Sequence, residues 1–299
     1  MTTIQEQDFA AEFSAWIGRA TTVDDEITLP AVRRMAAMLD QDETDYRHGS
    51  ALPPHWYSMF FTANARRSQI GHDGHPRKGD FLPPIPLPRR MFVGRKVSFP
   101  GVLRVGDHAT KRSEIARIEQ KQGRSGTLVF LTVRHTISVA GTPAVIEQQE
   151  VVYRDAPPAT GQGAGAAGAG KAATAAAPVR EAAWRATIDM DPVTVFRYSA
   201  LTWNGHRIHY DADYARNEEG YPGCVMNGAL TLHLSIDEAL KRAAGRPLVS
   251  LSARLVKPLF VGGKLVISGG ALAGDTLDVW ASDDAGNEAA VCTFTFGAA

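Results

Sequence analysis

One low-complexity stretch divides this chain into two parts. Residues 156–179 consist almost wholly of alanine, glycine, proline and threonine, and they lack the large apolar side chains that a folded core requires. Alanine alone favours a helix, but the five glycines between positions 161 and 170 oppose one. We therefore expect a flexible linker over residues 156–180, spanning about 25–30 Å, between an N-terminal domain (1–155) and a C-terminal domain (181–299).

The two parts share a sequence pattern. Leu29-Pro30 opens an apolar helical stretch and Asp191-Pro192 opens another, each with proline in the first turn. Later, residues 102–106 (Val-Leu-Arg-Val-Gly) are echoed by residues 258–262 (Pro-Leu-Phe-Val-Gly). Alternating, β-branched stretches that predict antiparallel strands follow each echo, at 127–139, 145–153, 277–281 and 289–296. Each half is therefore predicted to contain one or two helices wrapped by a curved antiparallel sheet, an α+β arrangement.

Composition narrows the class of protein. The 299 residues are 44% hydrophobic, which allows two cores, and 32 basic residues balance 32 acidic ones, so no overall field attracts nucleic acid or an anionic membrane. Cys224 and Cys292 are too few for a disulfide framework. No apolar run is long enough to span a membrane, and the first residues are polar and acidic, unlike a targeting signal. We expect a soluble cytoplasmic protein.

Polar groups are concentrated in residues 204–211, Asn-Gly-His-Arg-Ile-His-Tyr-Asp, directly after the second apolar helical stretch. His209 is at their centre. An imidazole beside an amide, a second imidazole and a guanidinium can act as a general base that activates water.

The residues from Phe196 to His209 resemble the hydratase signature of MaoC-like enoyl-thioester hydratases, in which an Asp-x-Asn-Pro-x-His segment follows the helix. Residues 220–228 resemble the next element of the family. That element contains a His-Gly pair, of which this chain has only the glycine, Gly228. In the first half, residues 89–94, 123–126 and 147–154 resemble the non-catalytic half of two-domain members. The resemblance implies a double hotdog fold, with two curved antiparallel sheets each wrapping a central helix and a catalytic C-terminal domain.

The same resemblance implies a hydro-lyase that adds water reversibly to an α,β-unsaturated acyl-CoA thioester, with no cofactor and no metal. Asn204 stands at the family's Asp and His206 at its Asn. Because an amide carries no proton at neutral pH, we expect His209 alone to titrate, Asn204 to hold the water and His206 to orient it. The N–H of Gly228, at a helix N-terminus, is the expected donor to the thioester oxygen.

Arg207 replaces an uncharged proline of the family pattern. A guanidinium fork suits a carboxylate, so we expect a dicarboxylyl-CoA substrate such as 3-methylfumaryl-CoA (mesaconyl-CoA) or itaconyl-CoA, which would give citramalyl-CoA. A structural ion pair with Asp211 or Asp213 is the alternative for Arg207. Further expected contacts are Asn227 and Tyr221 with the substrate, and Arg254 and Lys257 with CoA phosphates; for these two cations an exposed sheet edge is the alternative.

Other functions stay open at this level. They are a (3R)-hydroxyacyl-thioester dehydratase of fatty-acyl metabolism, a hotdog thioesterase that uses Asp211 or Asp213, and a non-catalytic acyl-CoA-binding protein. Residues 71–75, Gly-His-Asp-Gly-His, could suggest a metal site, but a flexible loop is the expected role of so glycine-rich a stretch. A homodimer is compatible with the sequence.

Overall fold

The computed structural model describes residues 8–62, 64–77, 79–123, 126–154 and 180–298. The expected linker, apart from Arg180, lies outside the described residues, and so do Arg124 and Ser125.

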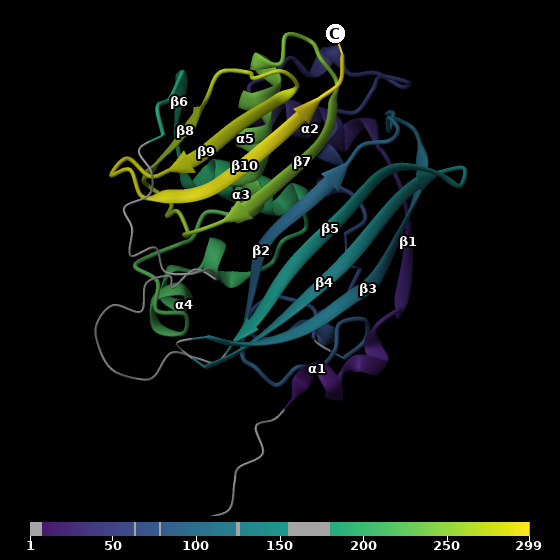
Figure 1. The fold of residues 1–299 in the computed structure, drawn as a ribbon, viewed down its shortest axis with the longest axis vertical. Coiled ribbons are helices and arrows are strands. Elements are labelled where there is room, and N and C mark those ends of the chain that lie inside the picture. The colour runs from purple at the N-terminus through teal and green to yellow at the C-terminus, as the bar shows by residue number, and fades with distance from the viewer. Residues whose placement is uncertain (1–7, 63, 78, 124–125, 155–179, 299) are drawn as a thin grey trace, which may run out of the picture.

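A single antiparallel sheet of ten strands forms the frame of the molecule, in the order β1-β3-β4-β5-β2-β7-β10-β9-β8-β6 (Figure 1). The first half contributes five strands and the second half the other five. The two sets join where β2 pairs with β7, with Gly94 opposite Arg254 and Val97 opposite Leu251. The strands are β1 (Ala20–Glu26), β2 (Arg89–Ser98), β3 (His108–Gly123), β4 (Gly126–Val139), β5 (Thr142–Arg154), β6 (Trp184–Asp189), β7 (Leu248–Leu255), β8 (Lys264–Gly269), β9 (Thr276–Ser282) and β10 (Glu288–Phe296).

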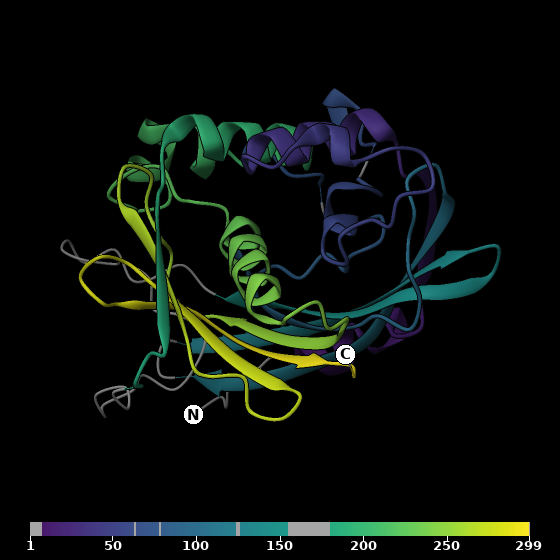
Figure 2. The same cartoon turned by 90° about the horizontal axis from the view of Figure 1, so that it is seen from above.

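Helices fill and cover the hollow of the sheet. Figure 2 shows α5 (Gly228–Arg242) inside the curve, with α2 (Leu29–Met38) and α3 (Pro192–Leu201) in contact across the open side. The predicted helices at Leu29 and Asp191 and the four predicted strands are confirmed. The remaining helical segments are α1 (Phe9–Glu12), α4 (Ala212–Asn217) and the 3-10 turns η1 (Ser14–Trp16), η2 (Glu43–Asp45), η3 (Trp56–Met59), η4 (Arg67–Gln69) and η5 (Arg207–His209).

The sequence repeat corresponds to a structural repeat. In the first half the N–H of Gly106 donates to the carbonyl of Ile27, and in the second half the N–H of Gly262 donates to that of Met190, both at 2.8 Å. The N–H of Leu52 donates to the carbonyl of Leu103, and the N–H of Met226 donates to the carbonyl of Leu259, each at 2.8 Å. Both glycines have φ near +90°, at +95° and +90°, which explains why each echo ends in glycine.

The two halves differ in their central helix. By the pairing above, η3 occupies in the first half the place where α5 begins in the second. The turn stops after four residues, and the chain soon reaches Phe61, which has φ of +58°. The expected central helix of the first half is therefore reduced to one turn, whose Trp56, Tyr57 and Met59 are buried.

One large apolar cluster runs through both halves, and it includes residues of α2, α3, α5, β7, β9 and β10. In the described part of the chain, no helix is long and apolar enough to span a membrane.

Candidate functional site

His209 ends the short turn η5, which follows α3. Its Nδ1 lies 2.7 Å from the carbonyl oxygen of Val225. Because a carbonyl only accepts, Nδ1 carries the proton and donates it, which leaves Nε2 with the free lone pair. The N–H of Val225 in turn donates to Ile208 at 2.8 Å. Two hydrogen bonds therefore hold His209 against Val225, which is three residues before Gly228.

The protonation state of His209 follows from its surroundings. Burial lowers its pKa to about 4, although the hydrogen bond to Val225 acts in the opposite direction. Burial also lowers the pKa of His206, to about 3, and the neighbouring His75 and His209 add to this effect. Both imidazoles are therefore neutral near pH 7, and Nε2 of His209 can accept a proton.

Asn204 shapes the loop between α3 and η5. Its Oδ1 accepts the backbone N–H of His206 at 3.1 Å, a turn typical of asparagine before glycine. In the described part of the chain its Nδ2 has no protein acceptor, so this amide group is free to bind water. The imidazole of His206 packs against that of His209, with ring centroids 5.6 Å apart.

A loop of the first half packs directly on this site. The imidazoles of His75 and His206 have centroids 4.2 Å apart, and Nδ1 of His75 lies 3.2 Å from Oδ2 of Asp73. The carbonyl of Asp73 accepts the N–H of Arg207 at 3.0 Å. At Gly74, with φ of +89°, a Cβ atom would lie 1.9 Å from the carbonyl oxygen of Gly205. The contact between the two loops therefore requires glycine.

Asp73 is held ionised by this loop. Burial raises its pKa, but hydrogen bonds from the side chain and backbone of His75 outweigh that effect and hold the pKa well below its ordinary value. The donor atoms of Asp73, His75 and His206 all lie within 4.8 Å of one another, as do those of His55, His233 and Asp237. Either trio has the ligand types of a metal site. In the first, however, the contact between Asp73 and His75 already uses one donor atom of each.

Arg207 forms an ion pair with Asp211, which is the alternative to substrate binding that the sequence left open. Its Nη2 and Nε lie 2.7 and 3.1 Å from Oδ2 of Asp211, and its guanidinium carbon lies 4.3 Å from the ring centre of Tyr214. The remaining Nη1 faces His72. Two sides of the guanidinium fork are thus occupied within the protein, and its role as a carboxylate ligand stays a prediction.

Gly228 begins α5, where the first N–H groups of the helix have no intrahelical acceptor. A Cβ atom at this position would lie 2.4 Å from Cδ1 of Leu255. Packing against β7 therefore accounts for a glycine at this position, and the role of its N–H as donor to the thioester oxygen stays a prediction. The preceding Asn227 is buried and shares hydrogen bonds of 3.2 and 3.4 Å with the hydroxyl of Ser199.

The other predicted contacts involve Tyr221, Arg254 and Lys257. Tyr221 is half-buried beside Phe260, with ring centroids 6.2 Å apart. Arg254 is exposed, and it alternates along β7 with Leu251, Ala253 and Leu255, whose side chains are the more buried ones. Lys257 is exposed beyond the end of that strand. Whether Tyr221, Arg254 and Lys257 bind substrate or CoA stays a prediction.

Sequence reasoning missed Asp73 and His75 as part of this site. Residues 71–75 attracted notice only as a metal-like pattern. Their partner His206 lies far along the chain, and local spacing carries no signal for such a contact.

Known proteins resemble this chain over most of its length. Residues 55–261 match the family model "Hydroxyacyl-thioester dehydratase type 2". Over 251 residues the chain is 41% identical to a mesaconyl-C(4)-CoA hydratase of Chloroflexus aurantiacus, which covers 84% of this chain and 86% of that protein.

Solved structures share the fold at low sequence identity. A MaoC-like dehydratase from Phytophthora capsici has a TM-score of 0.70 at 14% identity, covering 94% of this chain and 97% of its own. A conserved Mycobacterium tuberculosis protein described as a double hotdog has a TM-score of 0.55 at 13% identity, covering 94% and 96%. The predicted double hotdog fold is confirmed, and the chain belongs to the hydroxyacyl-thioester dehydratase type 2 family.

Proposed function

We propose that this protein adds water reversibly across the double bond of an α,β-unsaturated dicarboxylyl-CoA, with mesaconyl-CoA as the leading substrate and citramalyl-CoA as the product. The proposal rests on membership of a hydro-lyase family and on the name of the Chloroflexus relative. The structural observation that supports it is the neutral imidazole of His209, whose Nδ1–H is held by Val225 and whose Nε2 is available as a base.

The reaction needs one base and one site for negative charge. Nε2 of His209 takes a proton from water while the water oxygen bonds to the β-carbon of the thioester. The electron pair of the double bond moves toward the thioester oxygen, where the N–H of Gly228 stabilises it; one such donor contributes roughly 3–4 kcal/mol in comparable sites. The imidazolium of His209 then returns the proton to the α-carbon, so that one water is added and no group leaves.

His206 and the Asp73–His75 pair would support this cycle. A neutral His206 beside His209 positions the water together with Nδ2 of Asn204, and the ionised Asp73 stabilises positive charge that forms on the cluster of imidazoles. The carboxylate missing at position 204 would thus be replaced by one from the other half of the chain.

Thioester hydrolysis is disfavoured by the state of the two carboxylates it would use. Asp211 accepts the N–H of Tyr214 at the start of α4 and pairs with Arg207, so both of its oxygens are engaged. The side chain of Asp213 is 91% exposed. Neither carboxylate is placed as a nucleophile or base beside His209.

The direct test incubates the protein with mesaconyl-CoA, itaconyl-CoA and crotonyl-CoA, and follows enoyl-thioester absorbance together with free thiol. We expect absorbance to fall without thiol release, fastest with mesaconyl-CoA. Replacement of His209 by alanine should lower kcat/KM by about 10²–10⁴, the usual effect of removing a positioned base. Thiol release would instead show a thioesterase, and a change in neither signal would show a binding protein.

A further inference from the structure

We propose that Arg95 binds the second carboxylate of the acyl group, in a small buried subsite between the two halves of the molecule. This inference rests on the proposed function, because it names the residue that would select a dicarboxylyl substrate. It moves that role away from Arg207, whose fork is already shared with Asp211.

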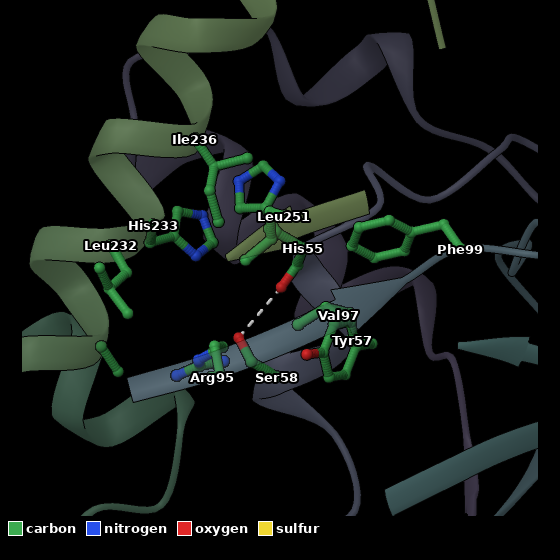
Figure 3. A pocket seen from close by; sticks show the side chains of 11 residues that line it. His55, Tyr57, Ser58, Arg95, Val97, Phe99, Leu232, His233, Ile236 and Leu251 are labelled. Carbon is green, nitrogen blue, oxygen red and sulfur yellow. Dashed lines mark hydrogen bonds between the residues drawn. The ribbon is translucent and has the colours of Figure 1, made fainter. Parts of the chain in front are cut away.

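The subsite is a cavity of about 10 Å³ enclosed between β2, η3, α5 and β7. Figure 3 shows Arg95 reaching into it from β2 and His233 from α5, with Ser58 beside Arg95. Leu232 and Leu251 form part of its apolar wall. An apolar cavity with a few convergent polar groups is the usual form of a small-molecule site.

One buried nitrogen atom in each of two polar side chains of this cavity lacks a hydrogen-bond partner among the described residues. Arg95 has a side chain 14% exposed, and its Nε has no hydrogen-bond partner among the described residues. Its nearest carboxylate oxygen, Oε1 of Glu147, lies 3.5 Å from Nη1, which is long for a hydrogen bond. His233 is 2% exposed, and its Nε2 also has no hydrogen-bond partner among the described residues, the carboxylate of Asp237 lying 3.9 Å away. Buried groups of this kind are costly unless something binds them.

Glu147 offsets the charge of Arg95 only in part. Its Oε2 accepts the hydroxyl of Tyr57 at 2.8 Å, and its ionised form is also stabilised by His135 and Lys111. A guanidinium has five N–H donors in a planar fork that matches a carboxylate. Arg95 therefore keeps donors for an additional anion.

Strand pairing places this subsite within an acyl group's length of the proposed reaction centre. Leu255 packs on Gly228, and Ala253, two residues away on the same face, is about 7 Å along β7. Arg95 pairs directly opposite Ala253 on the neighbouring strand. Ala229, the residue after Gly228, also lines the cavity. A thioester oxygen held at Gly228 would thus direct a four-carbon acyl chain toward Arg95.

The size of the cavity also selects the substrate. About 10 Å³ is room for one water-sized group, so a carboxylate, which has three heavy atoms, can enter only if the lining side chains shift. A long fatty-acyl chain would need a larger opening and would meet a buried cation. Both features favour a short dicarboxylate over the fatty-acyl alternative.

The test measures binding of unreactive saturated thioesters, so it does not depend on turnover. Calorimetry compares the C4 thioester of methylsuccinate with butyryl-CoA, which lacks the second carboxylate. We expect the wild-type protein to prefer the dicarboxylyl thioester and Arg95→Met to lose about 10–100-fold of that preference, the range of a charge-assisted hydrogen bond. Arg95→Lys should keep part of it, because it keeps the charge without the fork.

Two further variants control the experiment. Lys96 is the next residue of β2 and is exposed. Lys96→Met removes a cation there and should leave the preference for the dicarboxylyl thioester unchanged. Arg95→Met with Glu147→Gln removes both charges, so that loss of preference cannot come from an unpaired Glu147 that unfolds the protein. The proposal is overturned if wild type shows no preference, or if the preference persists in both Arg95→Met variants. The protein could show a preference that depends on Arg95 and yet hydrate neither mesaconyl-CoA nor crotonyl-CoA. That result would support the subsite and refute the proposed hydratase activity.

Discussion

At the scale of single residues, the proposed role of His209 depends on its environment as well as on its imidazole. The hydrogen bond to Val225 leaves Nε2 as the nitrogen that can accept a proton, and burial lowers the pKa so that this nitrogen is unprotonated near pH 7. The motif around positions 204–209 was enough to single out this histidine. It could not show that the carbonyl of Val225, rather than a carboxylate, would orient the ring.

This environment predicts the pH dependence of the reaction. The base works only when neutral, so kcat/KM for crotonyl-CoA should stay level from neutral pH down to about pH 5 and then fall as His209 is protonated, with its midpoint near the pKa of about 4. Crotonyl-CoA is the suitable substrate because its acyl group has no carboxyl group to titrate.

A midpoint near 6.5, the ordinary value for histidine, would contradict a buried base. Acid unfolding is distinguished by returning samples to pH 7. His206 and His209 are neutral in the folded protein but gain protons more readily when unfolded, so stability must also decline as pH falls from about 6.5 toward 4. Rates are therefore compared only where activity recovers fully.

Arg207 shows what local reasoning about charge leaves open. An arginine between two histidines predicted a substrate ligand, with an ion pair to Asp211 or Asp213 as the alternative. The ion pair with Asp211 is present, and the role in substrate binding stays a prediction. Arg95 drew no attention in the sequence, because a cation in an alternating strand is ordinarily exposed. Its burial comes from η3 and α5 packing over β2, a tertiary effect without a local signature.

At the scale of elements, the site is assembled from two loops of different halves. Helices α2 and α3 followed from proline positions, and strands β4, β5, β9 and β10 followed from alternation. Shortening of the first central helix to η3 did not follow, since Trp56, Tyr57 and Phe60 would suit the buried face of a longer helix equally well. The docking of residues 71–75 on residues 204–207 was equally hidden, because it depends on backbone contacts.

That docking can be tested with two matched glycines. Gly74 and Gly79 both have positive φ, but a Cβ atom at Gly74 would overlap the carbonyl of Gly205, whereas at Gly79 it would meet nothing within 4 Å. Gly79→Ala should cost about 1–2 kcal/mol of backbone strain and leave kcat/KM within about twofold. Gly74→Ala should displace the loop and lower kcat/KM at least about tenfold, the cost of misplacing supporting groups.

Unfolding in denaturant and steady-state kinetics on the same preparations separate the two effects. Equal loss of activity in both glycine variants would mean that backbone strain alone explains it. Unchanged activity in Gly74→Ala would mean that Asp73 and His75 do not contribute to the reaction.

At the scale of the whole molecule, the two halves are parts of one folded unit. They share the sheet through β2 and β7, they share an apolar cluster, and the cavity beside Arg95 is enclosed by both. The sequence repeat predicted two similar halves. It could not predict that Asp73 and His75 of the first half would pack beside His206, or that Arg95 would line a cavity with residues of the second half, because the resemblance assigned the first half no catalytic part.

Because both halves contribute strands to the sheet and residues to the candidate site, the behaviour of a split protein can be predicted. Residues 1–155 and 180–299, produced as two separate chains, should associate, because the strand pairing and apolar contacts between them are noncovalent. Each chain alone should expose the β2 or β7 edge, aggregate readily and lack activity. Co-expressed with a tag on one chain only, the two should co-purify and hydrate mesaconyl-CoA.

The split system also shows which half supplies each function. A second chain carrying His209→Ala should give an inactive complex with any first chain. A first chain carrying Arg95→Met should give a complex that loses its preference for the dicarboxylyl thioester while still assembling. Full activity of residues 180–299 alone would show that the second half is self-sufficient, and it would refute a role for Asp73, His75 and Arg95.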